Sequence, residues 1–315
     1  MRVGILSNTD VRCGNAAYAR DLSSALLPYY VNQIVSPVLE NMLAFKPNVV
    51  LINWHPAKVG NPDVNRIHAA GAKAILIYQN SIDNAWTNGP IFGEDAIVTH
   101  EPTALYNATV IPHGIPIVRG LWHEHYEPQN QSVGTAGFPF PWKRFDVVAE
   151  VAKRFNLQCM MIAPQHDFYD SRKFIEGIVG HLGPLADVHT EWMEIEGVVR
   201  RLSQCMFNVF WYQSKDIHDQ FGQSGSVRMG LAARRPLIIS DHRKMRDILE
   251  NYSDEVYVAH SELEVYKHAS DILQSIAVGA PVRVPKRILE DQGWPRVAKL
   301  YSDLIQRVMA SHSPA

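Results

Sequence analysis

The sequence predicts an α/β fold made of two Rossmann-like domains, each built on a parallel sheet. Short apolar strands alternate with helix-forming runs, which is the pattern of βαβ units. The strand segments are rich in β-branched residues and are bounded by polar, Gly or Pro residues, as in sheets that are covered on both faces. A polar, aperiodic stretch at 122–131 separates two such series. The length of 315 residues is about twice that of a typical domain.

The N-terminal series begins with a strand at 3–6 and a helix over 15–27, and we assign it to a domain over residues 1–125. Its other strands are expected at 48–52, 74–78, 96–99 and 109–111. The C-terminal series forms a domain over residues 126–290. Its strands are expected at 133–136, 158–163, 207–212, 236–240 and 255–258, and its helices include 194–205 and 226–233. The last segment, 291–315, holds an amphipathic helix that opens at Trp294-Pro295, because proline suits the first helical turn.

Composition and charge argue against several classes of protein. A formal net charge of -2 and a pI near 6.7 provide no global positive field of the kind that holds nucleic acid non-specifically. Cys13, Cys159 and Cys205 are widely spaced, which argues against a disulfide framework or a zinc knuckle. No apolar run approaches the ~20 residues that span a bilayer, and the N-terminal strand is too short and polar for a signal peptide. We therefore expect a cytoplasmic protein without stable membrane insertion.

Several common motifs are missing. The sequence has neither a GxGxxG dinucleotide fingerprint nor a GxxxxGK[ST] loop, which argues against hydride transfer and NTP hydrolysis. It also lacks HExxH and paired-cysteine ligand sets, and no metal site is expected.

The stretch at 134–146, GTAGFPFPWKRFD, is the strongest local signal for a ligand site. A strand ends there in a Gly/Pro loop that carries Lys143 and Arg144, and a helix follows directly. Backbone N–H groups at a helix start and nearby cations can converge on an anion, and this arrangement suits a diphosphate. The alternative is an ordinary strand-to-helix turn with a solvated Lys-Arg pair.

A second candidate anion site is the helix start at Ser224-Gly225-Ser226. It offers hydroxyl and N–H groups, and Arg228 one turn further on can add a fork of donors for phosphate oxygens. The alternative is a serine N-cap on a purely structural helix. In open parallel sheets, ligands bind beyond the carboxyl ends of the strands, where Gly14, Lys143 and this turn are all expected to lie.

Five motifs in order resemble the GT-B glycosyltransferases, and specifically their retaining, GT4-like branch. They are CGNAAYARDLSSAL, VIPHGIP, AGFPFPWKRFD, SGSVRMGLAARRPLIISD and WPRVAKLYSDLI. The resemblance implies a metal-independent, hexosyltransferase-like enzyme without a cofactor, which moves a sugar from a nucleotide-sugar donor to an acceptor with retention. It also implies a donor domain over 126–290, an acceptor domain over 1–125 with a cleft between them, and a last helix that crosses back toward the acceptor domain.

Sequence pattern and resemblance together give the candidate site. The catalytic candidates are Lys143, His55 and His113. The donor-binding candidates are Gly14, Phe138, Lys143, Arg144, Asp219, Ser224, Gly225, Ser226 and Arg228. The acceptor-binding candidates are Asn15, Asn80, Asp83 and His100. Several of these also have a structural reading: His55 and His113 as loop histidines, Gly14-Asn15 as a plain turn with an Asn cap, and Asp83, His100 and Asp219 as solvated loop residues.

The sequence also departs from the family pattern. The two glutamates around the donor helix would fall at Phe221 and Met229, and one gap would move the first to Asp219. The first basic donor residue would fall at Phe138, which leaves Lys143 as the matched cation. The usual N-terminal histidine would fall near Gln79 or Asn80, and His55 could compensate.

Two other functions fit these departures. One is a glycosyltransferase that acts on modified bases of phage-type DNA, and the other is a non-catalytic relative that binds nucleotide sugars. The sequence identifies neither the nucleotide, the sugar nor the acceptor, because these depend on pocket shape.

Overall fold

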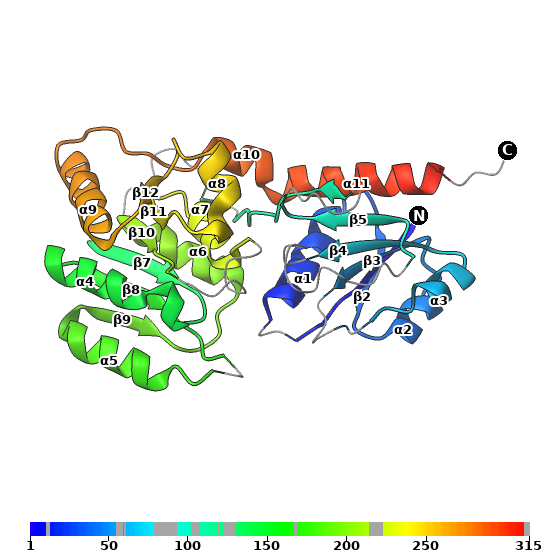
Figure 1. Cartoon of the computed structure of the whole chain (residues 1–315), viewed down its shortest axis with the longest axis horizontal. Helices are drawn as coiled ribbons and strands as arrows, with labels where there is room; N and C mark the ends of the chain where they lie inside the picture. The colour runs from blue at the N-terminus through cyan, green and yellow to red at the C-terminus, as the bar shows by residue number, and fades with distance from the viewer. Residues whose placement is uncertain are drawn as a thin grey trace. The chain divides into compact units, whose positions relative to one another are not determined.

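A computed structural model gives the structure of the chain and describes residues 1–10, 13–54, 59, 61–78, 93–101, 108–118, 120–121, 130–166, 169–213 and 223–311. The chain divides into two compact units (Figure 1). The first unit comprises Met1–Gly114, Phe221–Gln223 and Asp291–Ala315, and the second comprises Ile115–Gln220 and Ser224–Glu290. Each unit contains a six-stranded sheet whose paired strands are all parallel. The predicted α/β class with two parallel sheets is therefore confirmed.

The sheet of the first unit has the strand order β2-β1-β3-β4-β5-β6. The strands are β1 (Arg2–Leu6), β2 (Asn32–Ser36), β3 (Val49–Trp54), β4 (Lys73–Tyr78), β5 (Ala96–Thr99) and β6 (Thr109–Val110). The central strands β3 and β4 are buried along almost their whole length, as their unbroken apolar runs predict. The sequence reading did not name β2, an edge strand of sequence NQIVS that is only partly buried.

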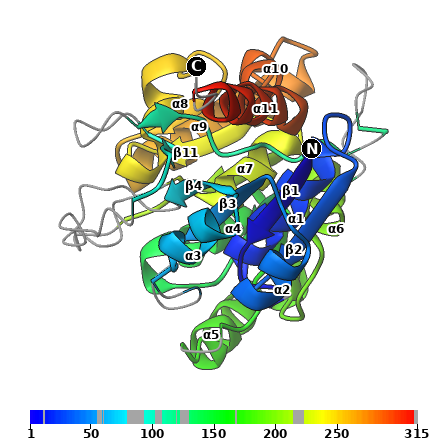
Figure 2. The same ribbon diagram turned by 90° about the vertical axis from the view of Figure 1, so that its right-hand side faces the viewer.

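Two pairs of helices cover the two faces of this sheet (Figure 2). The helices α1 (Gly14–Leu26) and α11 (Trp294–Ala310) share one apolar cluster with β1, β3 and β4. The helices α2 (Leu39–Ala44) and α3 (Val64–Ala69) pack on the opposite face. A hydrogen bond of 2.7 Å between the hydroxyls of Tyr18 and Tyr301 joins α1 to α11 inside the first cluster. The last helix is thus part of the first unit.

The sheet of the second unit has the order β12-β11-β10-β7-β8-β9. The strands are β7 (Ser132–Ala136), β8 (Gln158–Ile162), β9 (Ala186–His189), β10 (Phe207–Phe210), β11 (Leu237–Ser240) and β12 (Tyr257–Ala259). The strand predicted at 207–212 ends at Phe210, where the chain leaves the sheet. There the Tyr212 N–H donates to Ser240 Oγ, and the Gln213 N–H donates to the Trp142 carbonyl.

Helices also cover both faces of the second sheet (Figure 1). On one face lie α4 (Phe145–Phe155), α5 (Arg172–Leu182) and α9 (Glu262–Ala277). On the other lie α6 (Ile195–Gln204), α7 (Gly225–Ala232), α8 (Arg246–Asn251) and α10 (Arg287–Gln292). A Cβ at Gly230 would lie 2.5 Å from the Phe210 ring, so only glycine lets α7 approach β10 this closely. This contact fixes the position of the α7 N-terminus in the second unit.

Among the described residues, no helix is both long enough and apolar enough to cross a membrane.

Candidate functional site

The loop after β7 brings Lys143 against the start of α7. Gly137 has a φ of +122°, and a Cβ there would lie 2.2 Å from Ser226 Oγ and 2.9 Å from Lys143 Nζ. Only glycine leaves room for these two side chains at this point. The chain then forms a short 3-10 turn, Pro141–Lys143, and enters α4 through Arg144, whose φ is +46°. The turn directs the Lys143 side chain inward.

Lys143 is a buried ammonium group without an acidic partner in the described part of the chain. Its residue is 8% exposed, and Nζ donates to Ser226 Oγ at 3.3 Å. Three aromatic rings surround Nζ, with centroid distances of 5.9 Å for Phe140, 5.4 Å for Trp142 and 5.8 Å for Tyr212. Burial, and then the charge of Lys244, lower the pKa of Lys143 to about 7. An anion at this place would favour the charged form and raise the pKa of Lys143 again.

The N-terminus of α7 is capped on one side and open on the other. Ser224 is the N-cap: its Oγ accepts from the Val227 N–H at 3.4 Å and lies 2.9 Å from the Tyr212 hydroxyl. The N–H groups of Gly225 and Ser226 have no intrahelical partner, as at any helix start. A Cβ at Gly225 would meet no atom within 4 Å of it among the described residues. The cap predicted for Ser224 therefore coexists with accessible N–H groups beside Lys143.

The two predicted arginine donors are held by carboxylates. Arg144 Nη2 lies 2.8 Å from Asp146 and 2.7 Å from Glu262. Arg228 is 1% exposed, and its Nη2 pairs with Asp247 at 2.5 Å. These ion pairs offset the two guanidinium charges locally, whereas Lys143 has no such pair in the described structure. The structure thus brings Lys143, Ser224, Gly225 and Ser226 together but commits Arg144 and Arg228 to ion pairs.

Phe138 lies in the same loop as Lys143, on a cluster of aromatic rings. Its ring meets His166 edge-on at 4.7 Å and Trp192 at 6.1 Å. The side chain is partly buried. It offers an apolar face, not a charge, next to the candidate anion site.

In the first unit, the structure brings His100 and His113 together. Their ring centroids are 5.4 Å apart, and the Tyr18 ring lies 5.2 Å from His100 and 4.9 Å from His113. The side chain of Gln223 bonds to the backbone of both histidines. Its Oε1 accepts from the His113 N–H at 3.0 Å, and its Nε2 donates to the His100 carbonyl at 2.8 Å. His100 is 5% exposed, and its Nδ1 lies 2.8 Å from the Ile111 carbonyl. Gln223 was not among the site residues predicted from the sequence.

Gly14 and Asn15 form the first turn of α1, as predicted for a glycine loop after β1. A Cβ at Gly14 would meet no atom within 4 Å among the described residues, so the backbone is open there. The fully buried Asn53 at the end of β3 holds this turn. Its Nδ2 donates to the Asn15 carbonyl at 2.8 Å and to Ser7 Oγ at 2.9 Å. This buried amide is a second positioning residue that the sequence analysis missed.

Four candidates lie outside the described residues: His55, Asn80, Asp83 and Asp219. Most of the predicted interdomain linker at 122–131 also lies outside them. These remain predictions.

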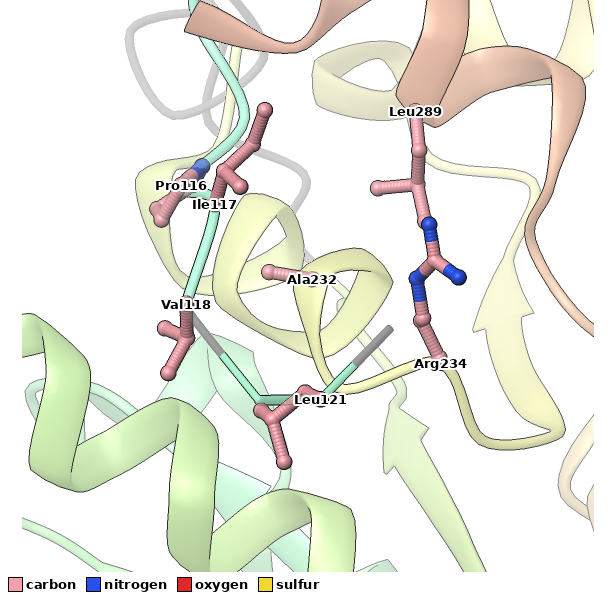
Figure 3. A pocket seen from close by; sticks show the side chains of 7 residues that line it. All are labelled: Pro116, Ile117, Val118, Leu121, Ala232, Arg234 and Leu289. Carbon is pink, nitrogen blue, oxygen red and sulfur yellow. The ribbon is translucent and has the colours of Figure 1, made fainter. Parts of the chain in front are cut away.

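The second unit also has a small pocket at the C-terminal end of α7 (Figure 3). Pro116, Ile117 and Val118 lie on one side of it and Arg234 and Leu289 on the other, and Leu121 and Ala232 complete the lining. The space holds little more than one water molecule. It lies at the opposite end of α7 from Lys143 and is too small for a nucleotide.

Comparison with known proteins places the fold. No protein-family model and no curated protein matches the sequence. Among solved structures, Anabaena HepE in complex with UDP and glucose is similar at a TM-score of 0.69 and 8% identity, over 98% of this chain and 100% of that one. The glycosyltransferase AviGT4, involved in avilamycin A biosynthesis, has a TM-score of 0.64 and 13% identity, over 99% and 98%. Sucrose-phosphate synthase from Thermosynechococcus elongatus has 0.65 and 12%, over 99% and 100%.

The chain has the GT-B fold.

In this GT-B fold, the second sheet carries the arrangement that sequence analysis indicated for an anion. Lys143 follows β7, and the start of α7 lies against it. Among the described residues, no group of three or more His, Cys, Asp or Glu side chains is placed to hold a metal ion.

Proposed function

We propose that the chain is a glycosyltransferase that moves a sugar from a nucleotide-diphosphate sugar to an acceptor with retention of anomeric configuration. The observation that carries this is the buried Lys143 ammonium, which faces the α7 N-terminus without an acidic partner in the described structure. A buried cation costs free energy unless an anion compensates it. A diphosphate provides that anion.

The fold adds support for this ligand class. Two solved structures of Anabaena HepE contain UDP and UDP-glucose, and the pneumococcal O-GlcNAc transferase GtfA was solved with UDP and GlcNAc. Identities of 9–12% limit what these structures show to the fold. The proposal for this chain therefore depends on its own cation and helix start.

The proposed chemistry is electrostatic. When the bond between the sugar and the diphosphate breaks, negative charge develops on the departing phosphate oxygen. Lys143 Nζ and the N–H groups of Gly225 and Ser226 would stabilise that charge, which is where preorganised donors lower the barrier most. The reaction then needs no metal, cofactor or covalent contribution from Lys143.

We assign acceptor binding to the first unit. His100 and His113 are held together there by Gln223, and the open turn at Gly14-Asn15 follows β1. Their polar groups suit the recognition of acceptor hydroxyls. We place the protein in the cytoplasm.

The first experiment is calorimetric titration with UDP, GDP, ADP and dTDP and their sugars. We expect binding of at least one, and we expect Lys143→Ala to weaken it at least ten-fold. The matched control is Lys267→Ala, which removes a cation from the exposed face of α9 in the same unit. No binding by any of these ligands would refute the proposal.

A second candidate function has one specific observation in its favour. Met229, where the family pattern has a glutamate, packs against the apolar core of the second unit. This is compatible with a protein that binds a nucleotide sugar without turning it over. Release of nucleoside diphosphate over a panel of sugar, lipid and modified-DNA acceptors separates the two, and NMR of a product reports the anomeric configuration.

A further inference from the structure

The turn between β11 and α8 follows the carboxyl end of a strand of the second sheet, as does the loop that carries Lys143. It is a short 3-10 helix, Arg243–Met245, that follows the carboxyl end of β11, the neighbour of β10. His242 caps the turn, since its Nδ1 accepts from the Lys244 N–H at 3.2 Å. Met245 is fully buried. The cap and this anchor fix the backbone of Lys244.

The Lys244 ammonium shares an aromatic ring with Lys143. Lys244 Nζ lies 5.5 Å from the centroid of the Trp142 ring, and Lys143 Nζ lies 5.4 Å from the same centroid. The indole is itself held in place. Phe140 and His242 lie nearly parallel to it, with interplanar angles of 8° and 18°. A cation within about 6 Å of an indole centroid is attracted to the ring, so Trp142 attracts both lysines.

Lys143 and Lys244 are like charges that lie close enough to interact. Like charges this close repel each other, and Lys244 is the charged residue that lowers the pKa of Lys143, after the larger effect of burial. In the described structure, Arg144 and Arg228 are paired with carboxylates, while no carboxylate pairs with Lys143. A multivalent anion would relieve this repulsion more than a singly charged one.

We propose that Lys244 is the second cation of the nucleoside-diphosphate site, which it forms together with Lys143 and the N-terminus of α7. The inference rests on the proposed function. The second positive charge comes from the β11–α8 turn, whereas Lys143 comes from the loop after β7.

The test is calorimetric titration of the full chain with the tightest binder among UDP, GDP, ADP and dTDP, and with the corresponding monophosphate. Lys244→Gln is compared with Lys244→Arg and with the control Lys267→Gln on α9. We expect Lys244→Gln to weaken diphosphate binding about ten-fold and monophosphate binding by less. Lys244→Arg keeps the charge and should bind within about three-fold of the unmodified protein. Melting temperatures without ligand check that each variant is folded.

The outcomes separate the two proposals. If the unmodified protein binds a nucleoside diphosphate and Lys244→Gln binds it as tightly as Lys267→Gln does, the role of Lys244 is refuted and the proposed function stands. If the unmodified protein binds none of the four, the proposed function fails and this inference fails with it. An equal loss for monophosphate and diphosphate would also refute the role of Lys244 as the second cation.

Discussion

Replacing Lys143 by methionine should stabilise the protein while removing donor binding. Burial lowers the pKa of this lysine from 10.5 to about 7. One unit of pKa corresponds to about 1.4 kcal/mol, so charging Lys143 in the folded state costs up to about 5 kcal/mol at pH 6. Methionine has a similar length and no charge. It loses the hydrogen bond to Ser226 and the ring contacts, together worth about 2 kcal/mol, so a net gain of about 1–3 kcal/mol is expected.

The same lowered pKa makes the stability of the protein depend on pH. A lysine whose pKa is lowered by folding binds fewer protons in the folded state, so the stability of the unmodified protein rises as the pH rises from about 7 toward 10.5. The advantage of Lys143→Met should therefore be largest below pH 7 and shrink above it.

Calorimetric melting at pH 6, 7.5 and 9 measures this difference. Each 1 kcal/mol of stabilisation corresponds to a rise of about 2–4 °C in melting temperature. The control Lys267→Met, on the exposed face of α9, should change stability by less than about 0.5 kcal/mol at every pH. A ligand at one hundred times its Kd for the unmodified protein should stabilise that protein by about 2.7 kcal/mol, and at the same concentration it should stabilise Lys143→Met by at most about 1.4 kcal/mol. Destabilisation by Lys143→Met at pH 6 would show that the ammonium is already compensated, and would refute the reasoning.

Three further outcomes are expected. Asp247→Ala should lower the free energy of unfolding by about 3–5 kcal/mol, because it leaves the buried Arg228 guanidinium without this carboxylate. Denaturant titration measures this loss, and a loss below about 1 kcal/mol would contradict the pairing. Gly137→Ala should cost about 1–3 kcal/mol and weaken nucleotide binding, because φ is +122° and the new Cβ would collide with Ser226 Oγ; unchanged titration and melting would argue against this geometry. Diphosphate binding near pH 8 should take up protons as Lys143 becomes charged, seen as a binding enthalpy that changes with the ionisation enthalpy of the buffer; equal enthalpies in all buffers would exclude it.

Most strands of both sheets were predicted, including two at the edges. The predicted strand at 96–99 coincides with β5, and the runs around β3, β4 and β8 differ from the structure by one or two residues. The edge strands β6 and β12 were predicted at 109–111 and 255–258, within two residues of their observed bounds. The edge strands β2 and β9 were not named, because their sequences, NQIVS and ADVH, hold no long apolar run.

The approach of Lys143 to the start of α7 follows from one rule of parallel sheets. β7 and β10 are neighbours, and the loops at their carboxyl ends meet at one edge. Lys143 comes from the loop after β7, and α7 follows β10 in the chain. The rule applies to any open parallel sheet, so the sequence predicted that both segments lie beyond the carboxyl ends of the strands; that β7 and β10 are neighbours is known only from the structure.

The ion pairs of Arg144 and Arg228 could not be predicted from the sequence, because they depend on where the carboxylates lie in the fold. Arg144 is adjacent to Lys143 in sequence, yet it turns to Glu262 on α9, far along the chain. Arg228 lies within one turn of Ser226 and instead meets Asp247 on α8. Lys244 has no nearby motif to mark it, but it shares Trp142 with Lys143. A basic residue can therefore be assigned to an anion site only once the positions of the nearby carboxylates are known. Of Lys143, Arg144 and Arg228, which the sequence proposed, the two arginines have carboxylate partners in the described structure and Lys143 has none.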